Sequence, residues 1–172
     1  RTKRSIANAF LELRKQKPLE KITVKELAEL AYINKATFYT HYHDIYDLAD
    51  QLETEFMNSV IAELPHPECI ITDPSLATRE LTDTLLAKRD ISNILFSGSR
   101  QGYFSEKIYV TLTEYIKSKY PNADYTLQHK IVLSLIIQGC FHAYQTFGND
   151  KNSDEVVEIL GEVGTCLKTN FL

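Results

Sequence analysis

Apolar residues recur at intervals of three and four positions along nearly the whole chain, and this spacing constrains the fold most strongly. The first such set is Ile6, Ala9, Phe10 and Leu13, and the last is Val156, Leu160, Val163 and Leu167. This spacing places apolar side chains on one face of an α-helix. No strand-like alternation and no internal repeat stands out, and glycine (6) and proline (5) are too scarce for a turn-rich β-protein. The sequence therefore predicts an all-α fold of about nine helices.

Capping residues and prolines delimit these helices. Thr23 and Glu26 form a capping box, and Asn34 and Asp44 are expected to cap the next two helices. The predicted helices cover 5–15, 24–31, 35–42, 44–64, 76–87, a short segment at 90–95, 104–119, 125–147 and 153–169. The segments 19–22 and 65–74 are expected to be irregular.

Composition excludes several classes of protein. Hydrophobic residues make up 44% and charged residues 24% of the 172 positions, as in soluble globular proteins. No run of 18 apolar residues is present, so we expect no membrane-spanning helix. The three cysteines are far apart and have no metal-binding spacing, which favours a reducing, cytoplasmic location.

Charge is distributed unevenly along the chain. Residues 1–43 contain nine Lys/Arg and four Asp/Glu, a net charge of +5. Residues 44–172 contain ten Lys/Arg and nineteen Asp/Glu, a net charge of −9. A basic N-terminal quarter on an acidic body favours a local contact with a polyanion, although an ordinary solvated surface would also give this balance.

The segment 23–48 contains the most specific motif, TVKELAELAYINKATFYTHYHDIYDL. Its spacing indicates a helix, a three-residue turn and a second helix, which is the helix-turn-helix arrangement. The residues that carry the motif are Thr23, Glu26, Ala28, Ala31, Thr37, Phe38, Tyr39, His41 and Tyr42, followed by Leu48. This pattern resembles the TetR family of bacterial transcription regulators over about residues 5–50. The rest of the chain fits that family only in being helical and of suitable length.

The resemblance implies a fold and a function. It implies a three-helix DNA-binding domain over 1–46 and a helical domain for ligand binding and dimerisation over 47–172. We therefore expect a homodimeric repressor that binds a palindromic double-stranded operator and is released by a small-molecule effector. The helix that begins at Asp44 would link the two domains as a rigid lever.

Candidate DNA contacts lie in and before the second helix of the motif. Lys35 and Thr37 would reach base edges from its first turn, with the small Ala36 allowing close approach. Tyr39 and His41, later on the same helix, suit phosphate oxygens. Thr23 at a helix N-terminus would contact phosphate, and a basic arm of Arg1, Lys3 and Arg4 could reach the DNA backbone or the minor groove. Phe38 and Tyr42 are expected to be core residues.

Two positions depart from the family pattern. Tyr32 follows the second alanine, where the family commonly has glycine, and a positive φ there would cost about 1 kcal/mol. Ile45, beside Asp44 and Asp47, stands where a lysine commonly touches phosphate. One expected charge contact with DNA is therefore missing, and two acids adjoin its place.

The C-terminal segment indicates a dimer and, more weakly, a ligand pocket. Helix 125–147 has more apolar surface than we expect a monomer to cover, and the last helix adds its own apolar stripe. The expected interface residues are Ile136, Gly139, Ala143, Val156, Leu160, Val163 and Leu167. The candidate pocket residues for a small apolar effector are Tyr103, Phe104, Tyr109, Tyr115, Phe141, His142 and Tyr144. They could equally be core aromatics, with the signal coming from a protein partner.

No catalytic motif is present. His41 and His43 are two positions apart and do not share a helix face. No phosphate loop, nucleophile elbow or zinc motif occurs, so we expect neither enzymatic activity nor a metal or cofactor. The alternative to a DNA-binding regulator is an all-helical signalling or adaptor protein that acts through protein partners with weak or no DNA binding.

Overall fold

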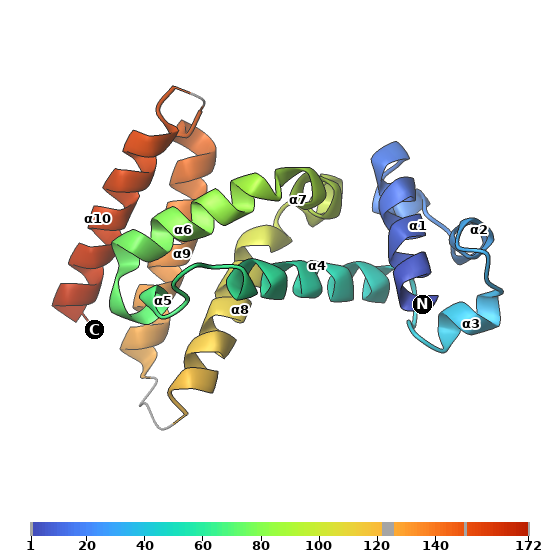
Figure 1. The fold of residues 1–172 in the computed structure, drawn as a ribbon, viewed down its shortest axis with the longest axis horizontal. Helices are drawn as coiled ribbons and strands as arrows, with labels where there is room; N and C mark the ends of the chain where they lie inside the picture. The colour runs from blue at the N-terminus through green and yellow to red at the C-terminus, as the bar shows by residue number, and fades with distance from the viewer. Residues whose placement is uncertain (1, 122–125, 150, 172) are drawn as a thin grey trace. The chain divides into compact units, whose positions relative to one another are not determined.

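The computed structural model describes residues 2–121, 126–149 and 151–171, and every regular element among them is helical (Figure 1). The α-helices are α1 (Thr2–Gln16), α2 (Val24–Leu30), α3 (Lys35–Tyr39), α4 (Ile45–Ala62), α5 (Cys69–Thr72), α6 (Pro74–Ala87), α7 (Arg89–Leu95), α8 (Tyr103–Lys119), α9 (Leu127–Phe147) and α10 (Ser153–Phe171). Two 3₁₀-helices, η1 (Leu19–Lys21) and η2 (Gly98–Arg100), complete the described elements. The all-α prediction is confirmed. No described helix is long and apolar enough to cross a membrane.

The chain forms two compact units that do not follow sequence order. Unit 1 contains the chain up to Phe56 together with Arg89–Phe104, and unit 2 contains Met57–Lys88 and the chain from Ser105 on. The expected boundary at residue 46 therefore does not coincide with the division into compact units. Helix α4 contributes residues to both units, and the α7–η2 segment returns to unit 1 from α6.

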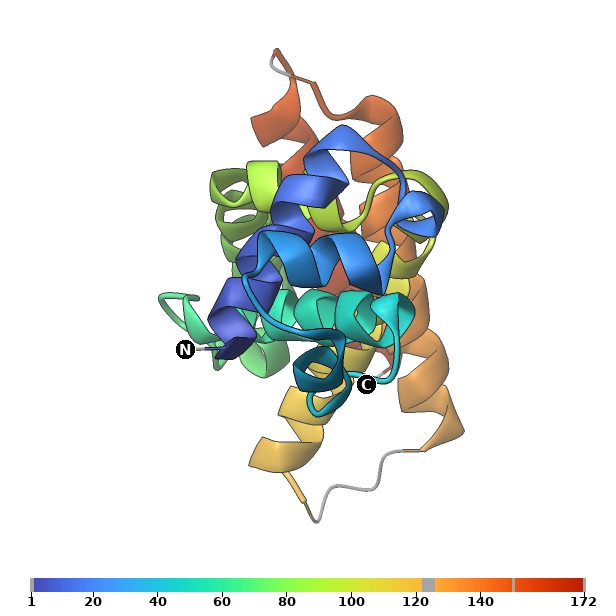
Figure 2. The ribbon, with the colours of Figure 1, turned by 90° about the vertical axis from the view of Figure 1, so that its right-hand side faces the viewer.

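Unit 1 is built on the apolar faces of short helices. In Figure 2 its first three helices, drawn in the blue range of the colour bar, lie together. The large apolar side chains that are buried most completely are Ile6, Phe10, Leu19, Leu27, Phe38 and Leu48. Phe38 and Tyr42 stack at 5.7 Å between ring centroids, so their prediction as core residues is confirmed.

Unit 2 has its core between α4, α8 and α9, where Ile61, Leu112 and Ile137 pack together. Helices α9 and α10 lie side by side, and α10 also packs along α6 (Figure 1). Gly161 of α10 makes the contact with α6 close, because a Cβ built there would meet Ser75 Cα at 2.9 Å.

Several predicted boundaries are wrong. Helix α3 ends at Tyr39 and not at Tyr42, and the hydroxyl of its C-cap residue Thr40 donates to the Thr37 carbonyl at 2.7 Å. The His41 amide then donates to Phe38 instead, which tightens the last turn. Helix α6 begins at Pro74 because Asp73 caps it by accepting from the Leu76 amide at 3.0 Å. Helix α7 begins at Arg89, one residue before the predicted start, and Asp90 lies in its first turn. The predicted helix start at residue 125 lies outside the described residues.

The segments expected to be irregular contain short helices. Leu19–Lys21 forms η1, and the 65–74 connection contains α5. Glu80 of α6 holds this connection by accepting from the His66 amide at 3.0 Å, and its other oxygen lies 2.6 Å from His66 Nδ1. This contact raises the pKa of His66 and lowers that of Glu80. Burial raises the pKa of the adjacent Cys69 thiol to about 11, so this thiol stays protonated at neutral pH.

We predict that Gly161→Ala destabilises the protein by about 1–3 kcal/mol, because the added methyl group overpacks the contact with Ser75. The matched control is Gly164→Ala on the same helix, where a Cβ would meet only the Pro74 Cβ, at 3.3 Å, and Ile136. The gain in helix propensity there offsets the tighter contact, so the control should stay within about 1 kcal/mol of the parent. Urea unfolding followed by circular dichroism measures both. Equal losses in the two variants would contradict the close contact at Gly161.

Candidate nucleic-acid interface

Two side-chain caps fix the short helices α2 and α3. Thr23 Oγ1 accepts from the Glu26 amide at 3.3 Å, which confirms the N-cap half of the predicted capping box. Asn34 Oδ1 accepts from the Thr37 amide at 2.7 Å and from the Thr37 hydroxyl at 2.9 Å. The Thr37 hydroxyl proton is therefore already used within the chain, and its oxygen and methyl group are what a ligand would meet.

The turn between α2 and α3 has a defined hydrogen-bond pattern. The Ile33 amide donates to the Ala28 carbonyl at 2.9 Å, and the Tyr32 amide donates to the Glu29 carbonyl at 3.2 Å. These two bonds form a Schellman motif, which places the residue after the C-cap in the left-handed region. Tyr32 occupies that position with φ = 56°, and its side chain is 95% exposed. This turn therefore has a positive φ although its residue is not glycine.

Helix α3 turns Phe38 into the core and leaves Lys35, Ala36 and Tyr39 exposed. Thr37 is half-buried beside the Asn34 cap. The first turn of α3 thus presents an ammonium group, a methyl group and a partly covered hydroxyl to solvent. Thr23 is also exposed, and the acid beside it, Glu26, is paired with Lys17.

The expected basic arm is part of α1. Lys3 and Arg4 are exposed in the first turn of that helix rather than in an extended segment, while Arg1 lies outside the described residues. The Lys3 ammonium lies 5.7 Å from the centroid of the Tyr42 ring, a cation–π contact that holds it near the end of the α2–α3 segment.

His41 lies beyond α3, in the turn that follows it, so its predicted place on the helix is wrong. Two acidic side chains accept backbone hydrogen bonds at the start of α4. Asp44 Oδ1 accepts from the Asp47 amide at 2.8 Å, and Asp47 Oδ2 accepts from the His43 amide at 2.8 Å. Hydrogen bonds from Gln51 and His43 lower the pKa of Asp47, and Ile45 is buried. The start of α4 therefore carries negative charge and no exposed lysine.

The candidate interface residues divide into two groups. Gly139 and Val163 are exposed, whereas Ile136, Ala143, Val156, Leu160 and Leu167 are half-buried. The large apolar residues exposed on these helices include Val163 but otherwise differ from the expected set. Helix α9 leaves Leu127, Ile131 and Leu135 exposed at four-residue intervals, and α10 leaves Ile159 and Val163 exposed. We call these the α9 stripe and the α10 stripe.

The candidate pocket residues belong to two different compact units. Tyr103 and Phe104 belong to unit 1, and the other five belong to unit 2. Tyr103 lies under the Arg100 guanidinium at 4.0 Å, Phe104 packs on Phe96, and the Tyr144 hydroxyl bonds Ser153 at 2.9 Å. Tyr109 and Tyr115 pack against the unit 2 core, Phe141 is half-buried, and His142 is exposed on α9.

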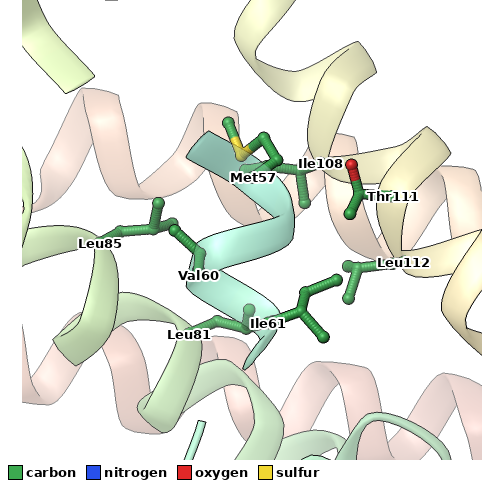
Figure 3. A pocket seen from close by; sticks show the side chains of 8 residues that line it. All are labelled: Met57, Val60, Ile61, Leu81, Leu85, Ile108, Thr111 and Leu112. Carbon is green, nitrogen blue, oxygen red and sulfur yellow. The ribbon is translucent and has the colours of Figure 1, made fainter. Parts of the chain in front are cut away.

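Unit 2 has a small apolar pocket elsewhere, between α4, α6 and α8 (Figure 3). It is lined by Met57, Val60, Ile61, Leu81, Leu85, Ile108, Thr111 and Leu112. Its volume is about 10 Å³, room for about one water molecule. Thr111 supplies the only hydroxyl in this set, and it already donates to the Lys107 carbonyl at 2.8 Å.

Sequence reasoning missed the buried charges of unit 1, namely Arg14, Glu53 and Arg100. The sequence did contain one indication of a buried charge. Glu53 falls four residues after Ala49 in the otherwise apolar register of α4, where a charge needs a buried partner. Among the described residues, no group of His, Cys, Asp and Glu is arranged to hold a metal ion.

No family model matches this chain, and no match was found among curated proteins or solved structures.

We predict that Tyr32→Gly raises the free energy of unfolding by about 1 kcal/mol, because glycine adopts the positive φ of this turn without a Cβ clash. The comparison variant is Tyr32→Ala, which removes the exposed ring but keeps a Cβ, and it should leave stability nearly unchanged. Urea unfolding measures both variants. Equal stabilisation by alanine and glycine would place the effect in the aromatic ring and not in the backbone.

Proposed function

We propose that this protein is a homodimeric, DNA-binding transcriptional regulator of the TetR type, released from a palindromic operator by an apolar effector. The capped α2–turn–α3 segment carries the proposal. It combines two short helices, a tight turn and an exposed first turn of α3 on the most basic part of the chain. A recognition helix requires this arrangement, because its first turn must enter the major groove.

The exposed residues of α3 suit DNA recognition. The Lys35 ammonium donates to guanine O6 and N7, while the Thr37 methyl group can pack on a thymine methyl. Ala36 allows the helix to approach the bases closely. Tyr39 and His41, with Thr23, Lys3 and Arg4, contact phosphates and so fix the register of the protein on the duplex.

The α9 and α10 stripes support dimerisation. The members of the two stripes are between 49% and 72% exposed. Aligned apolar residues on two adjacent helices are typical of a surface that a partner covers. A second copy of the chain covers them in a two-fold, isologous contact, which also supplies the symmetry of a palindromic operator.

The unit 2 pocket supports an apolar effector over a polar one, because its lining is aliphatic apart from the internally bonded Thr111. At about 10 Å³ it must expand to admit any organic molecule. Binding therefore displaces α4, α6 or α8, and the free energy of that displacement is available for signalling. In this proposal α4 acts as the lever, since its residues belong to both units.

The second candidate function is that of an adaptor acting through protein contacts. The start of α4 favours it, because Asp44 and Asp47 place negative charge where a phosphate would approach, and Ile45 is buried. An adaptor would show no binding to any duplex at low salt, whereas a weak regulator would bind with a steep salt dependence.

We predict that Lys35→Ala weakens binding to an operator selected from random duplexes by about 1–3 kcal/mol, with relaxed preference at one base pair. Tyr39→Phe should weaken binding to all DNA sequences equally, since phosphates carry no sequence information. Fluorescence anisotropy at two salt concentrations measures both effects. Lys119→Ala, an exposed lysine in unit 2, is the control. Unchanged operator affinity in Lys35→Ala would exclude α3 as the recognition helix.

We predict that Leu135→Lys combined with Val163→Lys converts the dimer to a monomer, because each subunit would bury two charges in an apolar contact. Sedimentation velocity measures the change, and operator affinity should fall with it. Val110→Lys alters a comparably exposed apolar residue on α8 and should leave the dimer intact. A double variant that stays dimeric would rule out these stripes as the interface.

A further inference from the structure

Tyr32, in the turn between α2 and α3, combines an unfavourable backbone conformation with a side chain that is almost fully exposed. Its φ of 56° is the one positive value among the described residues other than glycine, and its side chain is 95% exposed. The next most exposed of the large hydrophobic side chains in the described chain is Leu127, at 72%. The Tyr32 ring therefore gains almost nothing from packing within the chain to offset the cost of its backbone conformation.

The backbone of this turn is held by hydrogen bonds on both sides of Tyr32. Its own amide and that of Ile33 donate to the carbonyls of Glu29 and Ala28, and Asn34 then caps α3. The turn can be followed from α2 to α3 in Figure 1. A backbone that is already fixed lowers the entropy cost of binding, and a tyrosine side chain has only two rotatable χ angles to order. Tyr32 is thus suited to contact a partner outside the chain.

The length of the chain between Tyr32 and α3 limits where that partner can be. Lys35, the first residue of α3, follows Tyr32 by three positions, which span at most about 11 Å between the two Cα atoms. The major groove of DNA is about 12 Å wide. When the first turn of α3 enters the groove, as in the proposed function, Tyr32 lies within one groove width of the bases. The sugar–phosphate backbone borders the groove at that distance.

The chemistry of the Tyr32 side chain suits this backbone. A phenolic hydroxyl donates to a phosphate oxygen, and the ring can pack on the apolar face of a deoxyribose. The nearest charged residues along the chain, Glu29 and Lys35, are both exposed and opposite in sign. The turn therefore has no net charge of its own with which to attract a phosphate. A neutral donor here adds a contact without releasing a counterion from the DNA.

We propose that Tyr32 is a further DNA-contact residue, whose hydroxyl donates to a backbone phosphate at the edge of the major groove that α3 enters. The inference rests on the proposed function and adds to it a residue that had no role there. Tyr32 fixes the position of the protein on the duplex and contacts no base. Its contact with DNA compensates for a backbone conformation that is unfavourable in the free protein, so folding stability and DNA affinity respond in opposite directions when the side chain is removed.

The test measures folding and DNA binding in the same full-length variants. Tyr32→Gly relieves the positive φ, so its urea midpoint should rise while its affinity for a selected operator falls. Tyr32→Phe keeps the ring and the Cβ but lacks the hydroxyl. It should leave the urea midpoint unchanged and weaken operator binding about three- to tenfold. Circular dichroism in urea and fluorescence anisotropy measure the two properties.

Salt and sequence dependence identify the kind of contact. Tyr32→Phe should weaken binding to the operator and to a random duplex by the same factor, because phosphates carry no sequence information. The slope of log affinity against log salt concentration should not change, whereas Lys3→Ala should reduce its magnitude by about one. Tyr120→Phe, which alters an exposed tyrosine of unit 2, is the matched control and should change neither stability nor binding.

The outcomes separate this inference from the proposed function. If Lys35→Ala weakens operator binding but Tyr32→Phe and Tyr32→Gly bind as tightly as the parent, the inference fails and the proposed function stands. A parent that binds no duplex at low salt overturns both. A Tyr32→Gly variant that loses stability and affinity together would make Tyr32 a structural residue of the turn and would also overturn the inference.

Discussion

Burial of Phe38 and Leu27 is the interaction on which unit 1 depends. Helices α2 and α3 have seven and five residues, which is too short for either to be stable alone in water. They form because their few apolar side chains complete the core begun by Ile6 and Phe10 of α1. Every exposed residue of α3 therefore owes its position to the ring of Phe38 beneath it.

Much of this could be predicted from local sequence. The positions of Phe38 and Tyr42 follow from helical spacing, and the Asn34 cap follows from a side chain that satisfies free amides at a helix start. The end of α3 could not be predicted in this way. The apolar spacing of Phe38 and Tyr42 continues past Tyr39, so it carries no information on where the helix ends.

The partners of long-range polar contacts could not be predicted from the sequence pattern. Glu53 in an apolar register signals that a buried partner exists, but nothing in the sequence distinguishes Arg100 from the other basic residues as that partner. The lining of the described pocket could not be predicted for a related reason. Aromatic residues were predicted as ligand contacts, but Tyr103 and Tyr144 contact Arg100 and Ser153 within the chain. The described pocket lies between mainly aliphatic side chains, whose sequence spacing is the same as that of ordinary core residues.

The discontinuity of unit 1 has a consequence for synthesis on the ribosome. Glu53 emerges long before Arg100, and unit 1 lacks its last segment until Phe104 has followed Phe56 out of the exit tunnel. At about 5–20 residues per second, that interval lasts roughly 2–10 s. During it the N-terminal helices exist on the nascent chain with an unneutralised carboxylate in their core. A half-made chain therefore lacks the buried partner of Glu53, and the core of unit 1 is complete only after residues 89–104 have been translated.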